Sequence, residues 1–184
     1  MFSGGGGAEM GFDDRFLISE FMEIDPDCIN VLDLHWSGVP NRGDIRKVKP
    51  KTLSDAYLQI GGSPCQSFSL AGQRKGLEGE SGLFFDFVKV LKAKEAPYFI
   101  WENVKGTFSS EDGWDFAIIQ NELAEAGYIF RWEVVNARSV GIPQSRERIF
   151  IVGTLRERSA REVFFKARDG GENIDNTTSE KEPR

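Results

Sequence analysis

The segment Ala56-Tyr57-Leu58-Gln59-Ile60-Gly61-Gly62-Ser63-Pro64-Cys65-Gln66 carries a short apolar run into a cysteine with polar neighbours. Its first seven residues are predicted to form a buried strand, because the run is short and glycine and proline end it. A second apolar run, Pro97-Tyr98-Phe99-Ile100-Trp101, ends at Glu102. Ligands of open α/β sheets bind beyond the carboxyl ends of the strands. Cys65 and Glu102 are therefore the first two candidates for chemistry.

Apolar and amphipathic stretches alternate along the chain in the rhythm of βα units, which predicts an α/β fold with a mostly parallel sheet and flanking helices. Pro26 suits the first position of a helix, where its missing N–H costs nothing. The first strand is expected to be truncated, since only Met1 precedes Phe2. Strands are predicted at 1–2, 17–24, 56–62, 97–101, 128–135 and 148–155, and helices at 8–16, 26–36, 83–93 and 114–126.

Length and composition fit one domain. A chain of 184 residues is long enough to bury a sizeable core. We expect that domain over 1–168, because 169–184 is polar without an apolar period and is typical of a tail or linker. The net charge of -6 argues against a surface that binds nucleic acid on every side, although it allows a basic patch on one face. Neither a membrane span nor a signal peptide is predicted, so the expected location is cytoplasmic.

The cysteines and the histidine limit the metal and redox chemistry. Cys28 and Cys65 are too few for a disulfide framework, and His35 is the single histidine. A Cys/His zinc site is therefore not expected, and no metal is assigned.

Cys65 has two interpretations. A buried cysteine is usually an inert small hydrophobe, but this one follows a predicted strand and has Ser63, Gln66 and Ser67 around it. A nucleophilic thiol needs activation. His35 lies on a predicted helix, which disfavours a cysteine hydrolase. Glu102 is the better partner, because a carboxyl group that protonates a ring nitrogen makes a pyrimidine electrophilic enough for sulfur to add.

Polar and glycine residues near the start of the chain form a second set. Residues 2–7 predict a glycine turn that brings backbone N–H groups to a ligand, with a flexible terminus as the alternative. Glu23 stands where nucleotide-binding folds place an acid for a ribose diol, although a solvated acid fits equally. Asp44 could accept from an adenine amino group while Ile45 packs on the ring. The plainer interpretation of Asp44 is a turn aspartate.

Two further features lie in predicted loops and strand ends. Arg146 and Arg148 are two apart, so in an extended segment they point the same way and could bind a base carbonyl and a phosphate. Ordinary surface arginines are the alternative. Glycines 72, 76, 79 and 82 predict a mobile loop that closes over a ligand.

These motifs, in this order over residues 2–155, resemble the DNA (cytosine-5) methyltransferases. The ones that carry the resemblance are Phe2-Ser3-Gly4-Gly5-Gly6-Gly7, Glu23-Ile24-Asp25, Gly43-Asp44-Ile45, Gly62-Ser63-Pro64-Cys65-Gln66-Ser67-Phe68-Ser69, Gly82-Leu83-Phe84-Phe85-Asp86, Glu102-Asn103-Val104 and Gln144-Ser145-Arg146-Glu147-Arg148. One short motif is weak, whereas the ordered series is highly specific.

The resemblance implies a Rossmann-like methyltransferase fold that uses S-adenosylmethionine as methyl donor. It implies that Cys65 adds to carbon 6 of a cytosine flipped out of double-stranded DNA and that Glu102 assists at ring nitrogen 3. It also implies that Arg148 helps to hold the base and that Arg146 positions the nucleotide or the closed loop. Restriction-modification is the expected setting. The implied cofactor-binding residues are Phe2, Gly4, Gly5, Gly7, Glu23, Ile24, Asp44, Ile45, Pro64 and Leu83.

The chain departs from the family pattern after Leu155. Nothing after Leu155 resembles the target-recognition region or the closing motifs of the family. The chain is therefore expected to be a catalytic region, either a truncation or one subunit of a split enzyme whose complementing chain recognises the target. An inactive remnant and a transfer-RNA cytosine methyltransferase are the alternatives.

Overall fold

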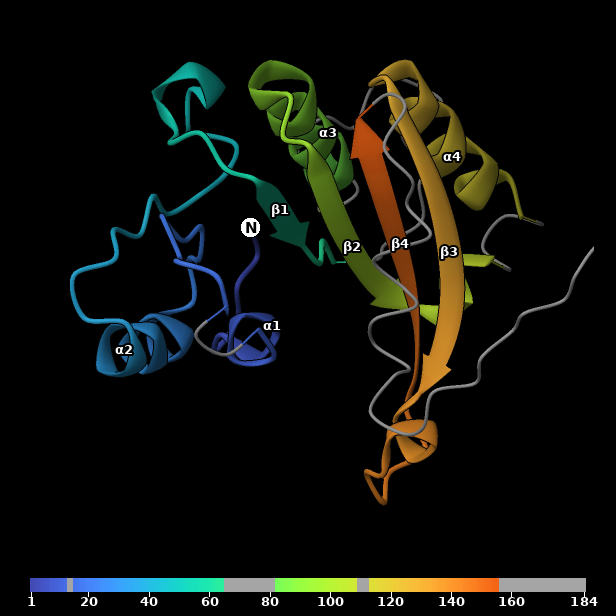
Figure 1. Cartoon of the computed structure of the whole chain (residues 1–184), viewed down its shortest axis with the longest axis horizontal. Helices are drawn as coiled ribbons and strands as arrows, with labels where there is room; N and C mark the ends of the chain where they lie inside the picture. Colours follow the sequence, from blue (N-terminus) through green and yellow to red (C-terminus); the bar gives the residue numbers. More distant parts are fainter. Residues whose placement is uncertain (13–14, 65–81, 109–112, 156–184) are drawn as a thin grey trace, which may run out of the picture.

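A four-stranded sheet forms the centre of the computed structural model, which describes residues 1–12, 15–64, 82–108 and 113–155. The strands are β1 (Leu58–Gly61), β2 (Tyr98–Val104), β3 (Tyr128–Asn136) and β4 (Glu147–Leu155), in the order β1-β2-β4-β3 (Figure 1). β1 and β2 are parallel, and β4 is antiparallel to both of its neighbours. Three strands therefore run in one direction and β4 runs against them, so the sheet is mixed. The predicted α/β class with flanking helices is confirmed.

The reversed direction of β4 was not predicted. The link from β3 contains only the short 3-10 helix η6 (Ala137–Val140) and a turn, whereas a parallel crossover needs a dozen or more residues. β4 therefore returns antiparallel and pairs on its other edge with β2, from Tyr98↔Thr154 to Val104↔Arg148.

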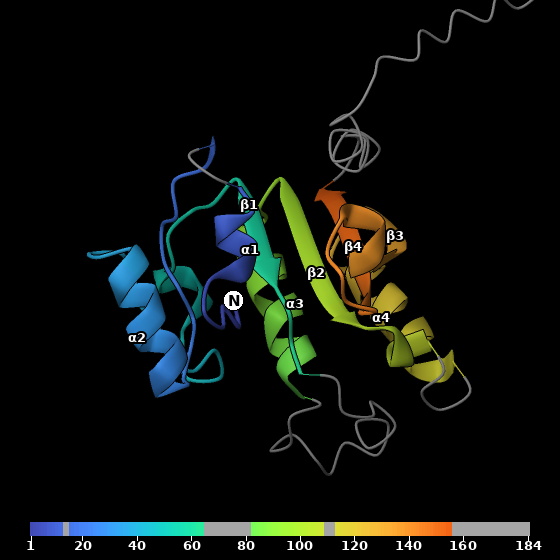
Figure 2. The ribbon, with the colours of Figure 1, turned by 90° about the horizontal axis from the view of Figure 1, so that it is seen from below.

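Two helices cover one face of the sheet. α3 (Gly82–Lys94) leads from the β1 side to β2, and α4 (Trp114–Glu125) leads from β2 to β3. Figure 2 shows both helices on the same side of the strands. The predicted helices at 83–93 and 114–126 agree with them, because each carries a row of large apolar side chains at helical spacing.

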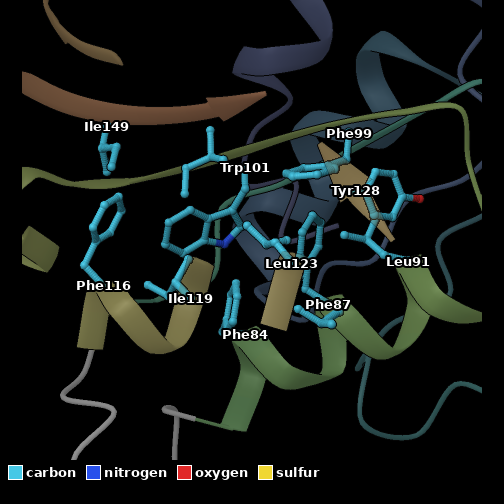
Figure 3. Close-up of a cluster of buried hydrophobic side chains, with 12 residues drawn as sticks. Phe84, Phe87, Leu91, Phe99, Trp101, Phe116, Ile119, Leu123, Tyr128 and Ile149 are labelled. Carbon is cyan, nitrogen blue, oxygen red and sulfur yellow. The ribbon is translucent and has the colours of Figure 1, made fainter. Parts of the chain in front are cut away.

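The main core lies between these helices and the sheet. Figure 3 shows Trp101 of β2 between the side chains of α3 and α4. The ring of Phe84 meets that of Trp101 edge-on at 5.4 Å between centroids, and Phe99 meets Tyr128 at 5.0 Å. The buried members are Phe84, Phe87, Val88, Leu91, Phe99, Trp101, Phe116, Ile119, Leu123, Tyr128, Ile149 and Ile151.

Residues 1–57 contain less regular structure than predicted. α2 (Pro26–His35) matches its prediction, and the Asp25 carboxylate caps it by accepting from the N–H groups of Asp27 and Cys28. The predicted helix at 8–16 is wrong in length: α1 spans only Gly7–Met10, and glycines lie at both of its ends.

The strands predicted at 1–2 and 17–24 are also wrong as regular strands. Phe21 forms one isolated parallel bridge with Asn41, and its N–H donates to the carbonyl of Pro40. Proline has no N–H with which to return a bond, which limits the ladder at this point. Phe2 donates to the Met22 carbonyl at 2.9 Å. These segments run side by side through a few hydrogen bonds that do not extend into a regular ladder.

Two predictions concern residues that the structure does not describe. The glycine loop between Gln66 and Gly82 falls almost entirely within 65–81, and the polar tail at 169–184 falls within 156–184. Both stay predictions, as does the domain boundary at 168. Within the described ranges, no helix combines the length and apolar character needed to cross a bilayer.

Candidate active site

The carboxyl ends of β1 and β2 bring Glu102 to the segment that leads into Cys65. The two strands pair in parallel with Gly61 opposite Trp101, so Gly62 lies beside Glu102. A Cβ atom at Gly62 would lie 3.1 Å from the Glu102 Oε2 atom. Glycine at this position therefore allows the carboxylate to approach the end of β1 closely.

Ser63 is fixed by two side chains of β2. The Trp101 Nε1 group donates to the Ser63 hydroxyl at 3.1 Å, and the Asn103 Nδ2 group donates to the Ser63 carbonyl at 2.9 Å. Ser63 and Asn103 are both buried. Sequence reasoning gave neither residue a role. The available signal was alternation along the strand: Trp101 and Asn103 flank Glu102 and must face the opposite side of the sheet.

Arg148 forms an ion pair with Glu102. The Arg148 Nε atom lies 2.8 Å from the Glu102 Oε1 atom, and the two side chains retain 22% and 36% of their exposure. The antiparallel register explains this contact, because Arg148 is opposite Val104 and therefore diagonal to Glu102 on one face. A molecule in solution can reach the carboxylate, which is only partly covered.

Arg146 is not a partner in this ion pair. It precedes β4, is exposed, and its carbonyl accepts from the N–H of Ala137 at 2.9 Å. The extended segment that sequence reasoning assumed for both arginines begins at Glu147. The role predicted for Arg146 on the nucleotide stays a prediction.

Glu23 connects the glycine turn to the next loop. Its Oε2 atom accepts from the Gly4 N–H at 2.7 Å, and its Oε1 atom accepts from the N–H groups of Ile24 and Asp25 at 2.8 and 2.9 Å. An ionised carboxylate offers about four lone-pair sites. Three are used here, so one is left for a ligand hydroxyl group.

Asn41 holds the same corner and was missed in the sequence. Its side chain accepts from the N–H groups of Glu23 and Gly43 and donates to the Glu23 carbonyl, at 3.0, 3.1 and 3.0 Å. An asparagine just before Arg42-Gly43 is a signal for a side chain that bonds backbone groups in a turn. Glu23 and Gly43 therefore lie at one corner.

Asp44 has a partner within its own turn. The Arg46 guanidinium donates to both carboxylate oxygens, with Nη2 to Oδ2 at 2.8 Å. These side-chain hydrogen bonds are the main cause that lowers the pKa of Asp44. Ile45, expected to pack on an adenine ring, is 5% exposed and belongs to a small core with Met22, Leu53 and Val90. Leu83 packs at the edge of the same core.

The glycine turn itself has room for a ligand. Gly4 has φ +53 and Gly6 has φ +80, and a side chain on Gly6 would overlap the ring of Trp36. A Cβ atom at Gly4 or Gly7 would meet nothing within 4 Å. The Ser3 hydroxyl oxygen is buried without a hydrogen-bond partner in the described residues. An open turn with a spare polar atom fits a polar ligand such as a nucleoside.

The remaining predicted site residues divide into described and undescribed ones. Phe2 adopts φ 54, a left-handed conformation that is rare for a bulky residue, and it packs against both cores. Gly5 lies against Val31, and Pro64 is exposed at the last described residue before Cys65. Cys65 itself lies outside the described residues.

The described side chains do not offer a metal site. They contain no group of three or more His, Cys, Asp and Glu residues placed to hold an ion. Cys28 lies on α2, where burial and the neighbouring Asp25 raise the pKa of its thiol.

Comparison with known proteins identifies the relatives of this chain. The family model described as C-5 cytosine-specific DNA methylase matches residues 1–183. An orphan methyltransferase of Bacillus phage SPR is 40% identical over 133 residues, which cover 70% of this chain and 30% of that protein. A type II methyltransferase of Shigella sonnei is 35% identical over 168 residues, which cover 90% of this chain and 44% of that protein. The similar curated proteins are covered over 23% to 49% of their own length.

Solved structures show the same fold. A Dnmt2 methyltransferase of S. pombe superposes with a TM-score of 0.72 at 22% identity, over 93% of this chain and 54% of the other. A methyltransferase of Entamoeba histolytica gives a TM-score of 0.64 at 18% identity, over 86% of this chain and 53% of the other. These likenesses confirm the predicted Rossmann-like methyltransferase fold.

Proposed function

Because the chain belongs to the C-5 cytosine-specific DNA methylases, we propose that it carries the catalytic residues that methylate carbon 5 of cytosine in DNA through a covalent bond to Cys65. The contact between Glu102 and Gly62 is the observation that supports this best. It brings an accessible carboxylate next to Gly62, three residues before Cys65.

The chemistry is assigned to side chains of this chain as follows. The Cys65 thiolate adds its electron pair to carbon 6 and forms an S–C6 bond, while Glu102 delivers a proton to ring nitrogen 3. The ring electrons then make carbon 5 nucleophilic. S-adenosylmethionine supplies the methyl group that carbon 5 takes. Loss of the proton from carbon 5 restores the C5–C6 double bond and expels the sulfur of Cys65 as thiolate, and the proton on ring nitrogen 3 returns to Glu102.

Arg148 has a positioning role in this proposal. Its 2.8 Å contact occupies Glu102 Oε1 and leaves Oε2 directed toward the end of β1. A charge-assisted bond fixes the carboxylate in one orientation, which a proton donor needs. The guanidinium keeps part of its surface exposed and is also available to the base or its phosphate.

The glycine turn and its neighbours are assigned to the methyl donor. Glu23 keeps one acceptor site for a ribose hydroxyl, and Gly4, which donates to Glu23, has open space beside it. Asp44 would share its carboxylate between Arg46 and an adenine amino group. The other residues, Phe2, Gly5, Gly7, Ile24, Ile45, Pro64 and Leu83, are assigned to the methyl donor by the resemblance to the family.

Target recognition is assigned to a part of the enzyme outside these residues, either a continuation of the same chain or a complementing polypeptide. The chain spans less than half the length of the curated relatives it matches. Flipping a cytosine out of double-stranded DNA costs a few kcal/mol, which protein contacts with DNA must offset. A chain of net charge -6 contributes few such contacts by charge alone, so full activity is expected only with the complementing part.

The test is covalent trapping on DNA that contains 5-fluorocytosine, with S-adenosylmethionine present. Fluorine cannot leave as a proton, so the adduct at Cys65 should persist and be seen as a DNA-linked band and a modified peptide. Cys65→Ser should lose it. Cys28→Ser is the matched control and should keep it, because Cys28 lies on α2 with a raised thiol pKa.

Two outcomes would contradict the proposal. One is an adduct that survives in Cys65→Ser. The other is no adduct even when the target-recognition part of a relative is added to complement the chain. An adduct with transfer RNA but not with DNA would show that the substrate is transfer RNA.

Glu102→Gln gives a second test. General-acid help is worth about 10²–10⁴-fold, so methyl transfer should fall by that range in single-turnover assays. Glu147→Gln is the control, because this exposed neighbour pairs with Lys105 at 2.9 Å and touches neither Arg148 nor Glu102 through its carboxylate in the described contacts. Equal losses in both variants would remove Glu102 from the mechanism.

A further inference from the structure

Among the described residues, every hydrogen bond to the Asp44 carboxylate comes from Arg46. The Arg46 backbone N–H donates to Asp44 Oδ1 at 3.0 Å, and the Nη2 group donates to Oδ2 at 2.8 Å. The Nε group donates to Oδ1 at 2.9 Å and is shared with Oδ2 at 3.1 Å. An ionised carboxylate offers about four lone-pair sites. Three N–H groups therefore leave one acceptor site, on the side of Oδ2.

The backbone on both sides of Asp44 is fixed as well. Gly43, at φ +72, donates its N–H to the Asn41 side chain at 3.1 Å, and Ile45 is buried in the small core. The Lys47 N–H donates to the Asp44 carbonyl at 2.9 Å. The Asp44 side chain keeps 13% of its exposure. The remaining acceptor site therefore has a defined direction and only a small opening to solvent.

Arg46 also acts on a second carboxylate, that of Asp86 on α3. Burial raises the pKa of Asp86, and the charges of Lys89 and Arg46 act against this rise. The charge of Asp44 adds to it. Two carboxylates from different parts of the chain thus share one guanidinium. Without this shared cation, Asp44 and Asp86 would only repel each other, which disfavours the charged form of both.

A carboxylate that is held in this way selects its ligand. A 6-aminopurine presents an N–H donor at the position where a 6-oxopurine presents a carbonyl acceptor. A carboxylate that is free to turn could avoid the oxo group, whereas a guanidinium fork fixes both carboxylate oxygens at once. A site built around a hydrogen bond rejects an analogue that cannot form it.

We propose that Arg46 is a positioning residue: it holds the Asp44 carboxylate for the amino group of a 6-aminopurine and so makes the site reject the 6-oxo analogue. The assignment of that purine to the methyl donor rests on the proposed function, whereas the hydrogen bonds that fix Asp44 do not. Asn41 joins this position to Glu23, the other carboxylate with one acceptor site left, because it accepts from the N–H groups of Glu23 and Gly43.

The experiment measures the affinity of the full chain for two nucleosides by titration calorimetry. S-adenosyl-L-homocysteine carries the 6-amino group, and S-inosyl-L-homocysteine carries the 6-oxo group. The wild-type chain should bind the first about 10- to 100-fold more tightly, the range expected for one hydrogen bond to a charged group. In Arg46→Gln this ratio of affinities should fall toward one. The target-recognition part of a relative is added if the chain alone does not bind.

Two further variants separate the orientation of the carboxylate from charge and from general damage. Arg46→Lys keeps the charge but lacks the planar fork, so its ratio should fall nearly as far as in Arg46→Gln. Arg42→Gln is the matched control, because Arg42 pairs with Glu20 at 2.7 Å and its side chain keeps 40% of its exposure, against 46% for Arg46. The Arg42→Gln ratio should equal that of the wild type.

A titration without ligand tests the same role in the free chain. Carbon-13 NMR of the Asp44 carboxyl group should show a lowered pKa in the wild type, because Arg46 bonds the carboxylate, and a higher pKa in Arg46→Gln. The other charged groups near this position, Lys47, Asp86 and Lys89, are unchanged in both proteins. Their charges therefore do not account for the difference.

Four results would overturn the proposal. The first is equal affinity of the wild-type chain for the two nucleosides. The second is an equal loss of affinity for both in Arg46→Gln, since a merely structural role lowers both affinities and leaves their ratio unchanged. The third is a full ratio in Arg46→Lys. The fourth is no binding of either nucleoside even with the added part. Only the fourth also contradicts the proposed site of the methyl donor.

Discussion

The two halves of this molecule hold their predicted site residues in different ways. The sheet half, residues 58–155, fixes Glu102 and Arg148 on long paired strands above a core that buries Trp101 and Phe99 completely. The first half, residues 1–57, holds Glu23 and Asp44 through side-chain bonds to nearby backbone groups. In paired strands, many backbone hydrogen bonds share the stability, so the loss of one has a small effect. Where a few separate side-chain bonds hold a turn, the loss of one opens it locally. We therefore expect the geometry of the Glu102–Arg148 pair to be more robust than the proposed cofactor corner, which is formed by Glu23, Asn41 and Asp44.

The largest expected effect tests the sheet half. Trp101→Ala removes a fully buried ring and its bond to Ser63, and such truncations cost about 3–5 kcal/mol. Urea unfolding should show this loss of stability as a lower urea concentration at the midpoint. Trp114→Ala is the matched control, since Trp114 is 71% exposed and its removal should cost about 0.5 kcal/mol or less. Similar losses in both variants would mean that the core does not support the site.

Paired asparagine variants sharpen the comparison. Asn103→Ala leaves the Ser63 carbonyl and the Val104 N–H without their partner, at about 1–3 kcal/mol. Asn41→Ala removes three bonds from the cofactor corner. Asn103→Ala should lower global stability, whereas Asn41→Ala should speed amide exchange only in residues 1–57.

The predicted difference between the two asparagine variants is wrong if Asn41→Ala shifts the global unfolding midpoint as much as Asn103→Ala does. Such a result would join the two halves into one cooperative unit. Hydrogen exchange by mass spectrometry and urea titration on the same samples distinguish the outcomes.

The pH dependence of the cofactor corner is a smaller effect. Arg46 lowers the pKa of Asp44, so the carboxylate contributes stability above its ordinary pKa and loses it as pH falls through the lowered value. A pair this exposed is worth about 0.2–1 kcal/mol. Asp44→Asn should therefore reduce stability slightly at pH 7 and make no difference in strong acid, as measured by thermal unfolding at both values.

The stability of the sheet half should fall at alkaline pH. Burial raises the pKa of Tyr128 to about 12, and its hydroxyl donates to the Ala96 carbonyl at 2.9 Å. A raised folded-state pKa means that stability is intact below pH 10 and falls as pH approaches 12. Tyr128→Phe should lose this alkaline dependence. A wild-type protein whose unfolding ignores pH in that range would contradict the prediction.

The sequence by itself determined the class of fold, the positions of α2, α3, α4 and the four strands of the sheet, and the order of the motifs. Local signals suffice for these features, because apolar periodicity and caps act over a few residues: Pro26 after Asp25 starts α2, and the apolar run before Glu102 forms β2. The family also follows from the sequence, since ordered motifs need no coordinates.

Only the tertiary structure decided how those motifs meet. The reversed β4 sets Arg148 diagonal to Glu102, and the parallel register of β1 sets Gly62 beside the same carboxylate. It also showed that Asn41, Ser63 and Asn103 hold the site, and that 17–24 does not form a regular strand. Each of these depends on pairing between segments far apart in the chain, and local propensity carries no information about a distant partner.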